Sequence, residues 1–226
     1  PDDKNALEEP LRIKDENPDT TVTVVSMGPP QADVAMREAL AMGADEAILI
    51  SGREFGGSDT WATSYIIATA IKKIPDYDII FCGRQAIDGD TAQVGPQIAE
   101  QLNIPQITYV QKLDIEGDKV IVQRQLEDGY TVVEAKMPVL LTAIKELNTP
   151  RYMTPKGIFE AYNKTVQVWG FNDVPVDAEK IGLKGSPTNV NRTFSPEAKG
   201  KGIMLEGADK ETVKTLIAKL DEKHLL

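Results

Sequence analysis

The sequence predicts an α/β protein with a mostly parallel, doubly wound sheet, antiparallel additions to that sheet and an extended C-terminal tail. Three observations lead to this fold class. Over residues 2–112, apolar runs of strand length alternate with amphipathic helical patterns, which is typical of parallel sheets covered by helices on both faces. Over residues 119–144, three strand patterns follow one another with short turns between them, which favours antiparallel pairing. From residue 148 onward Gly, Pro and Asn are frequent and periodicity is weak.

The alternating part opens with a helix rather than a strand. Asp2 is placed to cap a helix at residues 2–17, although Pro10 is unfavourable inside a helix because it has no backbone N–H. Proteins of this class usually open with a strand, so we expect one upstream of this helix. The β-branched run at residues 20–27 predicts the next strand.

Apolar spacing and capping residues predict the elements that follow. A helix at residues 31–42 is expected to turn Val34 and Leu40 inward. It should stop at Gly43, since glycine readily adopts the left-handed conformation that ends helices. The remaining expected elements are strands at 46–50, 77–82 and 105–112, a helix through Ile71 capped by Ser58 or Asp59, and a helix at 90–102 opened by a capping box of Asp90 and Gln93.

The second half of the chain changes character. The antiparallel additions are expected as strands at 119–125, 130–136 and 139–144. This pattern divides the chain into an α/β domain at residues 1–147 and an extension at residues 148–226. The extension has one further helical pattern, at 210–223, and on its own it cannot bury much apolar surface, so we expect it to wrap a partner.

Composition excludes several classes of function. The 226 residues carry a formal net charge of −10, which argues against nucleic-acid binding because that function needs a cationic face. The single cysteine, Cys82, cannot form an intrachain disulfide and fits a reducing compartment, so we expect a cytoplasmic protein. With one histidine, His224, we expect no metal site and no Cys–His catalytic pair. No apolar run reaches the roughly 18 residues of a membrane span, so no membrane partner is expected.

The segment at residues 81–96 is the densest functional signal. It runs from the end of a buried strand into the next helix, which is where open parallel sheets bind ligands. Gly83 and Gly89 permit a ligand to approach the backbone closely, and the amides of residues 91–93 can hold a phosphate at the helix start. Two alternatives are a capped helix after a tight turn and occupation of the same amides by the Asp90 carboxylate. The segment is neither a Walker loop nor a Gly-x-Gly-x-x-Gly loop.

Two other strand ends carry glycine and hydroxyl residues, at 27–30 and 55–60. Each could reach a ligand bound at a neighbouring strand, because the carboxyl ends of parallel strands share one edge of a sheet. Each signal is weak alone, but three on one edge strengthen the prediction of a ligand site.

Further motifs occur in an order typical of one family. Besides 82–96 they are 1–8, 26–30, 41–47, 55–60, 122–124 with 126–130, 138–142, 148–154 and 182–188. With this set the chain resembles the β subunit of electron transfer flavoproteins, and the resemblance covers nearly its whole length. Members of that family begin with a strand and a loop, in agreement with the strand expected upstream.

The resemblance implies a function. The β subunit pairs with an α subunit that carries FAD, and it holds an adenine nucleotide in its own nucleotide-binding α/β domain, here residues 1–147. Shuttle-type members hold AMP there, whereas electron-bifurcating members hold a second FAD that accepts hydride from NADH. Residues 88–95 resemble the bifurcating form, with Gly89 where shuttle-type members carry an acidic residue. The implied electron route runs from NADH through the α-subunit FAD to an acyl-CoA dehydrogenase and to ferredoxin or flavodoxin.

The resemblance also implies the cofactor site. Thr91, Gln93 and their neighbours are expected to hold the FAD diphosphate, and no side chain is expected to be catalytic, since the cofactor does the chemistry. The strand ends are expected to line the adenosine region. The full expected set is Met27, Gly28, Cys82, Gly83, Asp88, Gly89, Asp90, Thr91, Ala92, Gln93, Val94 and Gly95.

Two other functions stay open at this point. One is a shuttle-type β subunit with structural AMP, and the other is a stand-alone adenine-nucleotide-binding sensor, against which the long extension argues. Two residues depart from the family pattern: Thr131 stands where a Glu commonly follows Gly-Tyr, and Pro155 stands where shuttle-type docking loops have Leu. Residues 150–158 are expected to form the loop that docks the dehydrogenase.

Overall fold

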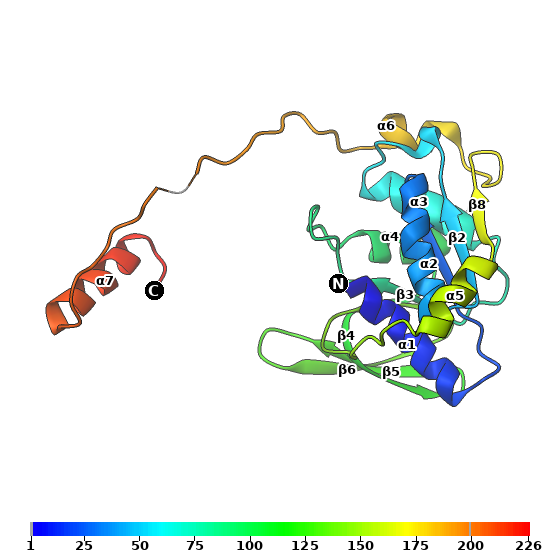
Figure 1. Cartoon of the computed structure of the whole chain (residues 1–226), viewed down its shortest axis with the longest axis horizontal. Coiled ribbons are helices and arrows are strands. Elements are labelled where there is room, and N and C mark those ends of the chain that lie inside the picture. Colours follow the sequence, from blue (N-terminus) through cyan, green and yellow to red (C-terminus); the bar gives the residue numbers. More distant parts are fainter. Residues whose placement is uncertain (1, 199) are drawn as a thin grey trace. The chain divides into compact units, whose positions relative to one another are not determined.

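The computed structural model describes residues 2–198 and 200–226; Pro1, in the first family motif, and Lys199, in the extension, lie outside the described residues. The chain divides into two compact units, Pro1–Asn189 and Val190–Leu226. The first unit mixes helices with parallel and antiparallel strands (Figure 1), which confirms the predicted fold class. The α/β unit continues to Asn189, beyond the boundary at residue 147 that the sequence suggested.

A three-stranded parallel sheet forms one part of the first unit. Its strand order is β1 (Thr23–Met27), β2 (Glu46–Ile50) and β8 (Val166–Trp169). Val24 lies opposite Ala47 across the first pair of strands. The last four residues of β2 are buried, as expected for a central parallel strand whose faces are both covered.

The sequence did not predict β8 or the helix before it, α5 (Pro155–Asn163). β8 has only four residues, and its pattern is weak because Gln167 and Val168 are exposed. Its pairing with β2 gives it a structure: Ile48 lies opposite Gln167 in a parallel register. This pairing is the reason that the first unit extends past residue 147.

The second sheet has five strands. Its order is β3 (Ile79–Gly83), β7 (Val139–Ala143), β4 (Gln106–Glu116), β5 (Lys119–Gln125) and β6 (Tyr130–Lys136). β4, β5 and β6 pair antiparallel, which confirms the antiparallel additions predicted at 119–125 and 130–136. The third predicted addition, at 139–144, is wrong in direction, because β7 lies parallel to both β3 and β4. The single sheet expected from the sequence is two sheets, because β1 and β3 do not pair within the described part of the chain.

The helices cover the sheets. In the first unit they are α1 (Asp2–Glu16), α2 (Asp33–Met42), α3 (Thr60–Ile71), α4 (Val94–Leu102), α5 and α6 (Gly182–Gly185), with short 3-10 turns η1 (Pro30–Ala32), η2 (Arg53–Phe55) and η3 (Ala178–Lys180). α2 packs on β2 and α5, and α3 packs against α4 (Figure 1). The helix α1 continues through Pro10, and Asp2 lies within its first turn, where its carboxylate contacts Arg84.

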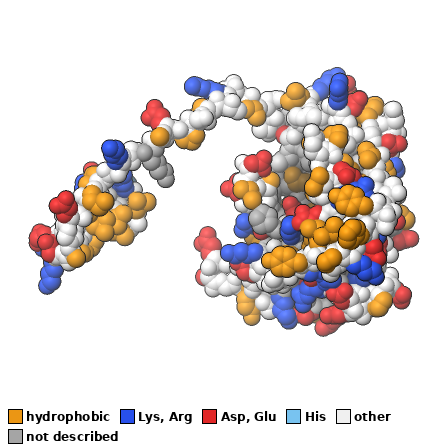
Figure 2. Space-filling view, in the orientation of Figure 1, with side chains coloured by type: hydrophobic (Ala, Val, Ile, Leu, Met, Phe, Trp, Pro, Cys, Tyr) orange, Lys and Arg blue, Asp and Glu red, His pale blue; other side chains and the backbone are white. Residues whose placement is uncertain are grey.

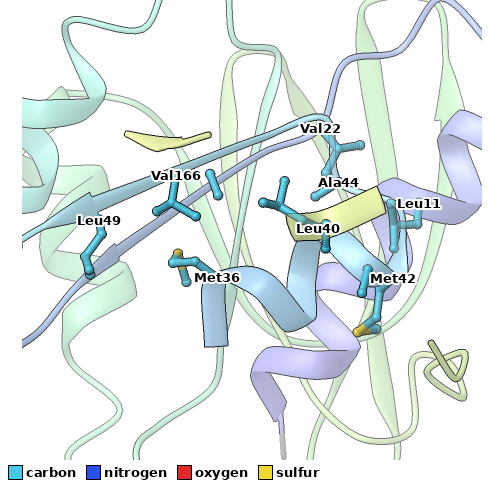
Figure 3. Packing of buried hydrophobic residues seen from close by; sticks show 11 residues of the cluster. Leu11, Val22, Met36, Leu40, Met42, Ala44, Leu49 and Val166 are labelled. Atoms are coloured by element: carbon cyan, nitrogen blue, oxygen red, sulfur yellow. The ribbon is translucent and has the colours of Figure 1, made fainter. Parts of the chain in front are cut away.

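A buried cluster joins α2 to the first sheet. Figure 3 shows Met36 of α2 beside Leu49 of β2 and Val166 of β8, and Met42 at the other end of α2 beside Leu11 of α1. Leu49 is 1% exposed, and full burial of such a side chain contributes about 1.5–3 kcal/mol.

The prediction that Val34 faces inward is wrong, because this side chain is 74% exposed. The stripe of α2 that faces the sheet is made by Met36 and Leu40, which lie one helical turn apart. Val34 lies two residues before Met36 and therefore falls on another side of the helix.

The second unit contains α7 (Lys210–Glu222), close to the helix expected at 210–223. Asp209 caps it by accepting a hydrogen bond from the Thr212 amide at 2.9 Å. No residue of α7 is buried. Val213, Leu216 and Ile217 are each about half exposed, and their spacing places them on one face of the helix.

Candidate functional site

The loop between β3 and α4 starts at the carboxyl end of β3. The Arg84 amide donates to Ala143 O at 3.0 Å, which ties the start of the loop to the end of β7. Asp90 and Ala92 have φ values of 49° and 52°. This left-handed conformation is uncommon for residues other than glycine, and it is concentrated at functional sites.

The helix α4 begins at Val94, later than the predicted start at Asp90. The predicted capping box is wrong: the Asp90 carboxylate accepts a hydrogen bond from Gln85, and Gln93 occupies the N-cap without a side-chain hydrogen bond to the helix amides. The left-handed conformation of Ala92 explains the late start, because such a residue cannot continue a right-handed helix. The Asp90 carboxylate therefore does not cap the α4 amides, which excludes that alternative.

The two glycines of the segment have different surroundings. A Cβ atom at position 95 would lie 3.0 Å from Thr142 Cγ2 and 3.5 Å from Cys82 Cβ, whereas one at position 89 would meet nothing within 4 Å. Gly95 therefore allows α4 to lie close to β3 and β7, which is a packing role. Gly89 borders open space in which a ligand can lie.

Cys82 and Gly83 are occupied by contacts within the chain. Burial, together with the negative charge of Asp3, raises the pKa of Cys82 to about 12, so the thiol stays protonated at neutral pH. The Gly83 amide donates to Asp3 Oδ1 at 3.2 Å, and a Cβ atom on Gly83 would lie 2.8 Å from Asp3 N. The first turn of α1 thus takes the space beside Gly83 in which the sequence suggested a ligand.

The structure brings together two of the three predicted strand ends. Thr60 Oγ1, in the segment after β2, donates to Gln93 Oε1 at 3.1 Å. Met27 and Gly28 end β1 in the other sheet; Met27 packs against the cluster that contains Ile50, and the Gly28 amide donates to Ile50 O at 3.0 Å. Thr60 was not on the predicted list, although it lies in a strand-end motif.

A hollow of about 270 Å³ beside the loop is lined by Asp2, Arg84, Gln85, Ile87 and Asp90. Arg84 Nε is buried and has no hydrogen-bond partner among the described residues. It lies 3.3 Å from Asp2 Oδ2 without the geometry of a hydrogen bond. Arginine is well suited to bind phosphate, so Arg84, which directly follows a strand-end glycine, is a candidate ligand contact that is absent from the set expected from the sequence.

A second candidate site is the loop before α5. Thr154 caps α5 by accepting a hydrogen bond from the Gly157 amide at 3.0 Å. Pro155 is the first residue of the helix, a position that suits proline because no N–H is needed there. Proline at position 155 is therefore compatible with the start of α5. Tyr152 is 95% exposed and Met153 is also exposed, so the loop presents apolar side chains to solvent.

Two further properties bear on function. Within residues 2–198 and 200–226, no helix combines the length and the apolar character that are needed to cross a membrane. In the same part of the chain, no three His, Cys, Asp or Glu side chains are grouped as a metal site would require.

These features define an α/β protein that presents an uncapped helix start and a strand-end loop at the carboxyl edge of its second sheet. The chain matches the electron transfer flavoprotein domain over residues 1–174 and belongs to that family. The resemblance drawn from the motifs is therefore confirmed, and electron transfer is the general role of the chain.

Similar proteins agree with this assignment. The chain is 60% identical over 227 residues to electron transfer flavoprotein subunit beta of Thermoanaerobacterium thermosaccharolyticum, covering 100% of this chain and 86% of that protein. It is 58% identical to electron transfer flavoprotein subunit beta of Clostridium acetobutylicum, with the same two coverages. It is 56% identical to the caffeyl-CoA reductase-Etf complex subunit CarD of Acetobacterium woodii, covering 100% of this chain and 87% of that protein.

Proposed function

We propose that the chain is the β subunit of a cytoplasmic, electron-bifurcating electron transfer flavoprotein. In this role it pairs with an α subunit that carries FAD and binds a second FAD at the β3–α4 loop. Electrons from NADH then pass through the α-subunit FAD to an acyl-CoA dehydrogenase and to ferredoxin or flavodoxin. The identity to a subunit of a caffeyl-CoA reductase-Etf complex supports a partner that acts on a CoA thioester.

The observation that carries the proposal is the free start of α4. Helix amino termini favour anions because their amides point outward and the helix dipole is positive there. At α4 no side chain of the N-cap residue caps these amides, and the carboxylate of Asp90, which could have capped them, is bonded to Gln85. A diphosphate therefore fits between the start of α4 and the open side of Gly89.

Other residues of the loop fit the same anion. Arg84 Nε makes no hydrogen bond to the described residues and forms an ion pair with Asp2 at 3.3 Å; its guanidinium can be offered to a phosphate group in place of that carboxylate. Thr91 and Gln93 are exposed on the loop and can donate hydrogen bonds to phosphate oxygens. Cys82 and Gly83 contact the ligand in this proposal only if the first turn of α1 moves away from Gly83.

FAD, when bound, supplies a centre that takes two electrons from NADH and releases them one at a time. The side chains of this chain bind and orient it, and none needs to act as an acid or a base. Position 89 is glycine in this chain, where the resemblance implies an acidic residue in shuttle-type members. The glycine leaves out a negative charge that would repel a diphosphate.

The test is the cofactor content of the purified αβ pair. We expect two FAD per pair by acid release and reduction of the bound flavin by NADH. Gly89→Asp adds a negative charge in open space and should reduce the content to one FAD without unfolding the protein. Gly129→Asp is the matched control, since a Cβ at Gly129 also meets nothing within 4 Å. One FAD and one AMP per pair would reject bifurcation and leave the shuttle-type function.

The partner contacts are proposed from two exposed regions. Residues 150–158 dock the dehydrogenase, with Tyr152 and Met153 as the exposed apolar contacts, and the apolar face of α7 packs on the α subunit. Replacing Tyr152 and Met153 by alanine should slow electron delivery to the dehydrogenase while NADH still reduces the flavin.

The β chain expressed alone should aggregate or lack its nucleotide. A stable, monodisperse β monomer with full nucleotide content would contradict the obligate pairing.

A further inference from the structure

We propose that Arg151 is a positioning residue, which fixes the docking loop on α1 before a dehydrogenase arrives. The inference rests on the proposed docking function of residues 150–158. The polar side chains involved are not among those that line the proposed cofactor site.

Arg151 makes a dense set of bonds to two carboxylates of α1. Its Nε donates to both carboxylate oxygens of Glu8, at 3.1 Å and 3.0 Å, and its Nη2 donates to Glu8 Oε1 at 3.0 Å. The Arg151 amide also donates to Glu8 Oε2 at 2.9 Å. Nη2 further donates to Asp15 Oδ2 at 2.7 Å. Both the backbone and the side chain of this loop residue are therefore held by one helix.

Three residues before Arg151, Asn148 is bonded to the same helix. Asn5 Nδ2 donates to Asn148 O at 2.7 Å, and Asn148 Nδ2 donates to Asn5 O at 3.0 Å. Asn148 Nδ2 also donates to Glu9 Oε2 at 2.7 Å. These bonds join residues that are 139 to 143 positions apart in the sequence, so the loop is fixed by tertiary contacts and not by a local turn.

The helix side of this network is buried. The Glu8 side chain is 5% exposed and that of Glu9 is 7% exposed, and Asn5 is buried as well. Burying carboxylates is unfavourable unless they are fully paired, and replacing a buried ion pair by apolar side chains often leaves stability unchanged. Stability alone therefore gives no reason for this arrangement, whereas fixing one loop conformation does.

The bonds of Arg151 and Asn148 to Asn5, Glu8, Glu9 and Asp15 are called the clamp below. Beside the clamp, the loop presents an apolar surface. Tyr152 directly follows Arg151 and is almost fully exposed, and Phe159 and Tyr162 of α5 are largely exposed. Figure 2 shows hydrophobic side chains gathered over α5 and toward α1. The partner that fits this surface is a protein with an apolar pocket for an aromatic anchor. A loop that is already ordered loses less conformational entropy when such a partner binds.

The test is a double-mutant cycle in the αβ pair, with affinity for the acyl-CoA dehydrogenase as the readout. Arg151→Lys keeps the charge but removes the planar fork, and we expect about tenfold weaker binding, equivalent to about 1.4 kcal/mol. Tyr152→Ala should also weaken binding. Because Arg151 acts through Tyr152, Arg151→Lys should add little in the Tyr152→Ala background. Independent, additive effects would overturn the proposal.

A control variant and a second measurement separate the positioning role of Arg151 from the docking function of residues 150–158. Arg53→Lys makes the same substitution at an exposed arginine of η2, away from Glu8, Glu9 and Asn148; we expect it to leave affinity unchanged. Hydrogen exchange of the amides at 151–153, without dehydrogenase, should be faster in Arg151→Lys and unchanged in Arg53→Lys. Unchanged exchange in Arg151→Lys would refute the clamp. If Tyr152→Ala binds normally, the docking function fails, while the exchange experiment still decides the clamp.

Discussion

The loop after β3 and the loop before α5 keep their shapes in opposite ways. Residues 84–93 are mostly exposed and contain two left-handed non-glycine residues, Asp90 and Ala92. Residues 148–154 are held by buried carboxylates and an amide of α1. The first loop therefore keeps donors free for a ligand, whereas the second uses its polar groups internally and exposes an aromatic side chain. This difference agrees with the two proposed roles, cofactor binding at the start of α4 and protein docking at residues 150–158.

The largest effect is expected at Gly95, where the first loop meets the sheet. Gly95→Asp would bury an unpaired carboxylate against Thr142, which should destabilise the fold by about 3–5 kcal/mol. Gly95→Ala should have a smaller effect, about 1–3 kcal/mol, because only a methyl group must be accommodated. Thermal unfolding of the αβ pair measures both. If Gly95→Asp removes flavin without lowering stability, position 95 contacts the ligand and the packing role is wrong.

An intermediate effect is expected in the second loop. Asn148→Ala removes the hydrogen bonds to Asn5 O and to the buried Glu9 carboxylate, so we expect a loss of about 1.5–3 kcal/mol in unfolding free energy. Asn189→Ala is the control, because Asn189 is exposed and has only a long bond of 3.4 Å to Ser186 O; it should change stability by less than about 0.5 kcal/mol. An equal loss of unfolding free energy in the two variants would show that the hydrogen bonds of Asn148 do not stabilise the fold.

A smaller effect is expected from acid. The hydrogen bond from Arg151 lowers the pKa of Asp15 below its ordinary value of 3.8. A lowered carboxyl pKa stabilises the folded state above the unfolded pKa, and this contribution is lost as pH falls through the folded pKa. The stability difference between the wild-type chain and Asp15→Asn should therefore be constant above about pH 5 and vanish under more acidic conditions. A difference that does not change with pH would show that Asp15 acts through packing instead of charge.

The smallest effect concerns Cys82, at the start of the first loop. Because burial raises the pKa of Cys82 to about 12, its thiolate is scarce at neutral pH and the thiol should react very slowly with aromatic disulfide reagents. Reaction rates in buffer and in guanidinium chloride measure this, and denaturation should restore the rate of an ordinary cysteine. Rapid labelling of the folded protein would mean that the thiol is accessible from solvent and that burial does not protect it.

Local patterns were sufficient for elements whose signals lie within a few residues. β2, β5 and β6 have the predicted bounds, and Asp59 caps α3 by accepting from the Ala62 amide at 3.0 Å, as predicted. Apolar alternation and a capping carboxylate act over one turn or one strand, so sequence alone reveals them. The family motifs at 82–96 likewise identified the β3–α4 loop and its glycines.

The tertiary structure decided what depends on distant residues. α4 starts at Val94 and not at the predicted Asp90, because the Asp90 carboxylate accepts a hydrogen bond from Gln85 and Ala92 adopts a left-handed conformation. β8 exists because β2 offers a parallel edge to a short segment far along the chain. The sequence by itself determined the α/β class, the family and the position of the candidate loop. It could not reveal that Glu8 holds Arg151 or that Asp3 covers Gly83, because such pairings depend on how separate elements pack, and no local pattern encodes that geometry.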